Sequence, residues 1–225
     1  MTPHNKKTSR VLGFAFLLQF VTSFSVIWIK SAWHILGDIQ ATMLKIAKNP
    51  GLLRANILMD LLTALGVIFL GAILYITLRD QNEKIALTAF GFYILEGALL
   101  ASSKMATFAL LCISQQFVST RGPEYFLTLG NLFLESMNYV EDILLMLAFC
   151  VGGILFYFLL HISRVVPPWL SLWGLLGLIP LLIGNLASFF NIDLPYILYL
   201  PYLPFEFVIA AWILIKGLPN RDMTF

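Results

Sequence analysis

Long apolar runs recur along the whole of this 225-residue chain, separated by short polar turns. A helix of about 20 apolar residues is long enough to cross the hydrocarbon layer of a membrane, which is about 30 Å thick. Hydrophobic side chains make up 60% of the sequence and charged ones only 12%, whereas soluble domains carry about 25% charged residues. The sequence therefore predicts an integral membrane protein built from α-helices.

The runs predict an all-α fold in a single domain over residues 1–225, a polytopic membrane helical bundle with six transmembrane helices. Cationic residues precede the first run, as in a signal peptide, but the run is longer than usual and no A-x-A cleavage site follows it. We therefore expect it to remain as the first span. The predicted spans cover about 11–29, 55–78, 85–118, 124–161, 169–189 and 196–216, the last with Pro201 and Pro204 inside it.

The segment between the first two spans has helical spacing but covers only about ten residues, too few to cross a membrane. Asp38 is suited to cap its start. We expect a short interfacial amphipathic helix, with Trp33 and His34 at the level of the lipid headgroups. Its apolar face is formed by Leu36, Ile39, Met43 and Ile46.

The third and fourth predicted spans are longer than a membrane requires, on the order of 50 Å each. We expect them to protrude together as a hairpin that turns at Arg121, and a break in the fourth span is the alternative. Polar residues recur on the fourth span at spacings of three and four, so they form one stripe that should face protein or trapped water. The stripe consists of Thr128, Asn131, Glu135, Asn138 and Asp142.

Ionisable side chains within the predicted spans fall in the outer half of the membrane or at its middle, which predicts a polar pocket open to the outside. A hairpin at Arg121 places Lys104 between Glu135 and Asp142. The alternative is that Lys104 only neutralises one of these acids. Glu96 and Glu206 are the best candidates for protonation. The full set of proton, cation or ligand-binding candidates is Glu96, Glu206, Asp60, Lys104, Glu135, Asn138 and Asp142.

Other chemistries find little support in the sequence. The three histidines, His4, His34 and His161, are too far apart to form a zinc or haem site. A net charge of +2 without a basic patch argues against nucleic acid. Cys112 and Cys150 lie in apolar runs, where free buried cysteines are common. We predict no catalytic residues, metal or cofactor.

Four blocks of sequence resemble a bacterial multipass membrane family known as domain of unknown function 4386. The resemblance extends from the first span to Gly217 and implies a protein of the bacterial inner membrane, without an established activity. The excess of Lys and Arg in alternate loops places both termini in the cytoplasm. The blocks are Leu78-Arg79-Asp80-Gln81-Asn82, Tyr93-Ile94-Leu95-Glu96-Gly97-Ala98, Ser163-Arg164-Val165-Val166-Pro167 and Leu200-Pro201-Tyr202-Leu203-Pro204-Phe205-Glu206.

These observations favour a non-enzymatic membrane protein whose pocket binds or transports a small solute, with protons. Two alternatives stay open. One is an intramembrane enzyme acting on lipid, with Lys104 and nearby acids in acid-base roles. The other is a structural subunit whose polar stripe binds a partner helix. The predicted partners are the lipid bilayer and a small solute or proton, and the sequence leaves the substrate and the oligomeric state open.

Overall fold

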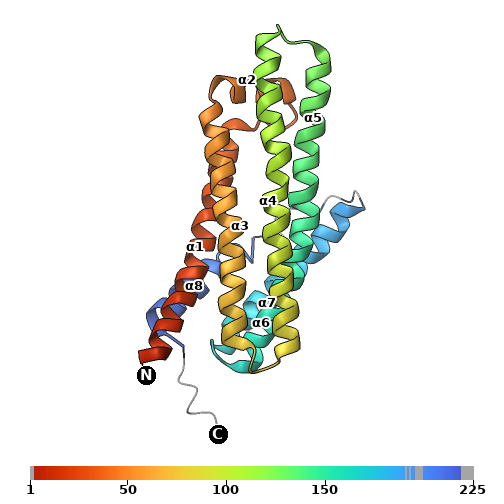
Figure 1. Cartoon of the computed structure of the whole chain (residues 1–225). Coiled ribbons are helices and arrows are strands. Elements are labelled where there is room, and N and C mark those ends of the chain that lie inside the picture. Colours follow the sequence, from red (N-terminus) through yellow and green to blue (C-terminus); the bar gives the residue numbers. More distant parts are fainter. Residues whose placement is uncertain (1–2, 191, 193, 196–199, 219–225) are drawn as a thin grey trace. The chain divides into compact units, whose positions relative to one another are not determined.

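The computed structural model of the chain describes residues 3–190, 192, 194–195 and 200–218, and every regular element within them is a helix (Figure 1). Five helical segments are long and apolar enough to cross a membrane: Ser9–Trp33, Pro50–Leu78, Glu83–Ser119, Glu124–Ser163 and Pro168–Phe189. The prediction of an all-α multipass membrane protein is confirmed. The elements are α1 (Pro3–Trp33), α2 (Ile39–Lys48), α3 (Pro50–Leu78), α4 (Glu83–Ser119), α5 (Glu124–Tyr139), the π-helix η1 (Val140–Leu145), α6 (Met146–Ser163), α7 (Pro168–Phe189) and α8 (Phe205–Lys216).

The sixth predicted span is not a continuous helix over its described part. Residues 196–199 lie outside the described residues, and residues 200–204 form turns. Helix α8 begins only at Phe205 and contains 12 residues, too few to cross a membrane alone. Pro201 and Pro204 explain the difference, because proline lacks a backbone N–H and also disfavours helical geometry in the residue before it.

The described residues form two compact units. Unit 1 contains Met1–Phe20, Gly66–Glu96 and Met146–Phe225, and unit 2 contains Val21–Leu65 and Gly97–Leu145. Helices α1, α3 and α4 contribute residues to both units, and the run from α5 to α6 passes from unit 2 to unit 1 after Leu145. Each unit has its own hydrophobic core.

The core of unit 1 is rich in aromatic side chains that pack edge to face. The ring centroids of Tyr93 and Phe156 are 5.0 Å apart, and those of Tyr157 and Phe205 are 4.9 Å apart. Gly174 of α7 permits this packing, since a Cβ atom there would lie 2.5 Å from Phe205 Cζ and 2.9 Å from Tyr157 Cδ2. Small residues often allow close approach between membrane helices in this way.

Unit 2 contains the short helix α2, which occupies the predicted position. Asp38 caps its start, because the side chain accepts a hydrogen bond of 2.8 Å from the backbone N–H of Ala41. Met43 and Ile46 of α2 are fully buried against protein. Leu36, predicted to share their face, precedes the helix and is 88% exposed.

The predicted turn at Arg121 is confirmed. Helix α4 ends at Ser119 and α5 begins at Glu124. Arg121 and Gly122 between them both have positive φ angles, of 66° and 72°. The left-handed conformation suits Gly122, whose N–H donates a 2.8 Å hydrogen bond to the carbonyl of Phe117 and so closes the end of α4.

The fourth predicted span is helical throughout but not α-helical throughout. Six residues in its middle, Val140–Leu145, form the π-helix η1. The sequence alternative of a break in this span is therefore not observed, and the helix continues through a wider turn instead. π-Helices are rare and occur frequently at functional sites. This one carries two neighbouring acids, Glu141 and Asp142.

Candidate functional site

Unit 2 contains a buried ion pair network centred on Lys104 of α4. The Lys104 Nζ atom lies 2.6 Å from Asp60 Oδ2 of α3 and 2.6 Å from Glu141 Oε1 of η1. The side chains of Lys104 and Asp60 are only 6% and 5% exposed. A buried ammonium between two carboxylates is stabilised only when its partners are held in good geometry. Here α4 supplies the ammonium, and α3 and η1 supply one carboxylate each.

The Asp60 side of the network continues through uncharged groups. Asn56 donates a 2.7 Å hydrogen bond from Nδ2 to Asp60 Oδ2, and its Oδ1 accepts a 2.9 Å bond from Trp33 Nε1. Trp33 is 1% exposed, so its ring packs against protein. Its indole N–H has a buried partner, which is what a tryptophan inside a protein needs. Beside it, burial and the charge of Lys30 lower the pKa of His34.

The Glu141 side carries a second cation. Lys30 Nζ of α1 lies 3.4 Å from Glu141 Oε2 and donates a 3.2 Å hydrogen bond to Asn138 Oδ1. Ser103 Oγ also donates to Glu141 Oε1, at 2.9 Å. The four charged groups of the network are therefore two ammonium groups and two carboxylates, which neutralise each other.

Lys104 is thus paired, as the simpler sequence interpretation proposed, but the predicted partners Glu135 and Asp142 are wrong. The inner face of α5 is instead apolar, formed by Phe126, Gly130, Leu134 and Met137. Glu141 follows Met137 by one turn and continues this face towards Lys104. That spacing points to Glu141 only once this face of α5 is known to be buried, and the sequence analysis left Glu141 out of the candidates.

The polar stripe of the fourth span faces away from the core of unit 2. Thr128, Asn131, Glu135 and Asp142 are exposed, and Asn138 is half-buried. Glu135 Oε1 accepts a 2.6 Å hydrogen bond from Asn131 Nδ2 within the stripe itself. The stripe therefore does not face the core of unit 2, which the apolar side of α5 covers. The expectation that it faces protein or trapped water stays a prediction.

Unit 1 contains a second cluster, of tyrosines and glutamates, at the centre of its aromatic core. The hydroxyl oxygens of Tyr157 and Tyr202 are 2.7 Å apart, and Tyr202 donates a 3.1 Å hydrogen bond to Glu206 Oε1. Tyr93 lies within electrostatic reach of Tyr157. Because Tyr202 donates its proton to Glu206, Tyr157 donates to Tyr202, and the whole chain points toward the carboxylate.

Glu96 lies in the same cluster, within electrostatic reach of Glu206. It is 5% exposed, and its Oε2 atom is buried without a hydrogen-bond partner among the described residues. No ion pair in the described part of the chain involves Glu96 or Glu206. Two buried carboxyl groups within electrostatic reach of each other cannot both be ionised at low cost when no described cation pairs with them, so we expect at least one of them to hold a proton.

The seven predicted residues thus fall into two groups. Glu96 and Glu206 belong to unit 1, and the other five belong to unit 2. The tyrosine chain was missed, since the sequence interpretation assigned the aromatic residues to packing. Tyr202 lies four residues before Glu206, a spacing that indicated their contact. Over the residues that the structure describes, no group of three or more His, Cys, Asp and Glu side chains could hold a metal ion.

Helices of this length and apolar character, with ionisable groups buried between them, define a multipass membrane protein. A family model described as "Domain of unknown function (DUF4386)" matches residues 11–217. The chain belongs to this family, as its sequence blocks suggested. No curated protein and no solved structure matches the chain.

Proposed function

We propose that the chain is a membrane protein that takes up and releases a proton at Glu96 and Glu206 and couples this to the binding or movement of a small solute. The observation that carries the proposal is the uncompensated carboxyl pair in the core of unit 1, with the Glu96 Oε2 atom left without a described partner. Buried ionisable groups in membrane helices commonly mark ion or proton pathways.

The tyrosine chain gives the pair a route for protons. Tyr157 and Tyr202 are linked in series to Glu206. A hydroxyl group both donates and accepts, so both bonds can reverse when Glu206 gains a proton. Protonation of Glu206 can thereby be communicated to Tyr157 without movement of a helix.

The proposal rests on Glu96 and Glu206 alone, because the charges of Asp60 and Glu141 are already compensated by Lys104 and Lys30. It includes an outward-facing site and both termini in the cytoplasm, which the distribution of Lys and Arg in the loops supports. A lipid-acting enzyme would require Lys104 as an acid or base, and both of its described contacts are with carboxylates at ion-pair distance, so we do not put it forward.

Infrared titration tests the proton site directly. In lipid bilayers, we expect a carboxyl C=O band that appears on acidification and disappears on alkalinisation. Glu96→Gln and Glu206→Gln should each shift the midpoint of this step, because the remaining carboxyl group still titrates, and the double variant should abolish it. Glu135→Gln, on the exposed stripe, is the matched control and should retain it. A band that persists unchanged in the double variant would refute the proposal. Liposomes containing pyranine then measure proton movement, which Glu206→Gln should stop.

A second function, as a partner-binding subunit, is favoured by the exposed polar stripe of α5. It predicts that Thr128→Cys, in a background of Cys112→Ser and Cys150→Ser, reacts slowly with maleimide in native membranes and rapidly after purification. Ser119→Cys, at the exposed end of α4, is the control and should react rapidly in both. Equal rates for Thr128→Cys in the two preparations would exclude a partner on the stripe.

A further inference from the structure

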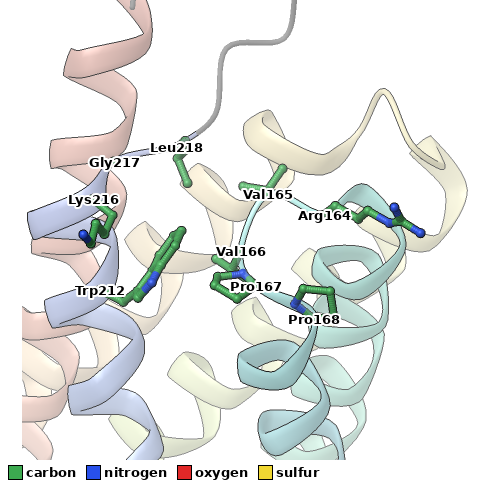
Figure 2. Close-up of a pocket in the computed structure, with 9 residues that line it drawn as sticks. All are labelled: Arg164, Val165, Val166, Pro167, Pro168, Trp212, Lys216, Gly217 and Leu218. Carbon is green, nitrogen blue, oxygen red and sulfur yellow. The ribbon is translucent and has the colours of Figure 1, made fainter. Parts of the chain in front are cut away.

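The turn between α6 and α7 and the end of α8 line a shallow, open hollow of about 370 Å³ in unit 1 (Figure 2). Helix α6 ends at Ser163, α7 begins at Pro168 and α8 ends at Lys216, so the hollow lies where three helices end. Two of these helices belong to segments long enough to cross a membrane. The hollow is therefore at the depth of lipid headgroups, and its volume is typical of sites for small ligands.

The floor of the hollow is apolar. Val166 and Leu218 are 1% and 4% exposed, and Figure 2 shows the indole of Trp212 beside Val166 and Pro167. The Leu218 backbone is fixed in place, because its N–H donates a 2.9 Å hydrogen bond to Ser9 Oγ of α1. Tryptophan is enriched at the boundary between membrane and water, where its ring contacts both hydrocarbon and polar groups.

Two cations flank this floor, and none of the described residues that line it is acidic. Figure 2 shows Arg164 and Lys216 at opposite ends of the hollow, with their charged groups directed outward. Both side chains are exposed, and neither forms an ion pair with a described residue. Arg164 has a φ angle of 50°, a left-handed conformation that is unfavourable for residues other than glycine. Arg164 therefore occupies a backbone conformation that glycine would adopt at lower cost.

We infer that this hollow binds an anionic phospholipid, with the headgroup attracted by the positive charges of Arg164 and Lys216 on either side and the start of an acyl chain against Trp212. Basic pockets between membrane helices recognise anionic headgroups. A free phosphate would use the two cations but gain nothing from the apolar floor, so the combination favours a lipid. This inference is independent of the proposed proton site.

Quenching of tryptophan fluorescence by brominated lipids tests the site. The Trp212 signal is obtained as the difference between the wild-type protein and Trp212→Phe in phosphatidylcholine bilayers. We expect brominated phosphatidylglycerol to quench it at a lower mole fraction than brominated phosphatidylcholine. Arg164→Gln and Lys216→Gln should each weaken this preference about fivefold, the effect of one charge at a membrane surface, and the double variant should abolish it.

The matched control is Arg79→Gln with Lys84→Gln, which removes the same charge from the turn between α3 and α4 of the same unit. It should retain the preference, and an equal loss would show that general charge attraction is sufficient. Loss of the preference in excess inorganic phosphate would identify a site for soluble anions instead of lipid. If Trp212→Phe does not fold, native mass spectrometry of the wild-type and double-variant proteins should show retained phosphatidylglycerol only in the former, and equal retention would overturn the inference.

Discussion

Lys104→Met is expected to destabilise the protein by about 3–5 kcal/mol, the usual cost of removing one partner from a buried ion pair. The methionine fills a similar volume but leaves the Asp60 carboxylate, 5% exposed, without its cation. Glu141 retains only Lys30, at 3.4 Å. Unfolding of the purified protein by titration with SDS, followed by tryptophan fluorescence, measures the loss.

Two further variants separate the charge effect from a general effect of mutation. Lys48→Met removes an exposed lysine in the last turn of α2 and should change stability by no more than about 0.5 kcal/mol. Asp60→Asn and Glu141→Gln, added to Lys104→Met, remove both unpaired charges and should restore most of the lost stability. If Lys104→Met unfolds at the same SDS fraction as Lys48→Met, the network contributes nothing to the fold.

Phe205→Ala is expected to cost about 3–5 kcal/mol, the usual effect of truncating a fully buried phenylalanine. Phe205 has no exposed surface, and its ring packs against Tyr157, Tyr202 and Trp173. The cavity would open directly beside Gly174, which has no side chain to fill it. The same SDS titration measures the effect.

Phe207→Ala provides the comparison, because it lies two residues further along α8 and is 50% exposed. Its ring contacts Phe20 at 5.6 Å, so a small loss is expected. A loss in Phe207→Ala as large as that in Phe205→Ala would mean that the core of unit 1 is not organised around the aromatic cluster described above.

Helix positions were predictable because they depend on local signals. The length of apolar runs located the helices, Asp38 marked the start of α2, and Arg121 with Gly122 marked the turn after α4. These features act over a few residues, so the sequence contains them directly. The last predicted span is not one continuous helix, and the reason is also local. Two prolines close together begin a helix better than they continue one.

The side of α5 that faces the core was not predictable from periodicity alone. The polar stripe and the apolar face with Phe126 and Met137 both follow helical spacing. This spacing alone does not indicate which of the two faces contacts protein. The π-helix adds a second difficulty, since its wider turn alters the direction of the residues that follow. The partner of Lys104 depends on both, which is why Glu141 was found only in three dimensions.

The ion pair network also has a consequence for biosynthesis. Its four charges lie on α1, α3, α4 and η1, so they emerge from the ribosome one after another, and an unpaired charge costs about 2.5–3.5 kcal/mol at the centre of a membrane helix. Asp60 and Lys104 can pair before η1 is made, whereas Lys30 meets Glu141 only after five-eighths of the chain has been translated. We therefore expect the network to be completed only once η1 has been inserted.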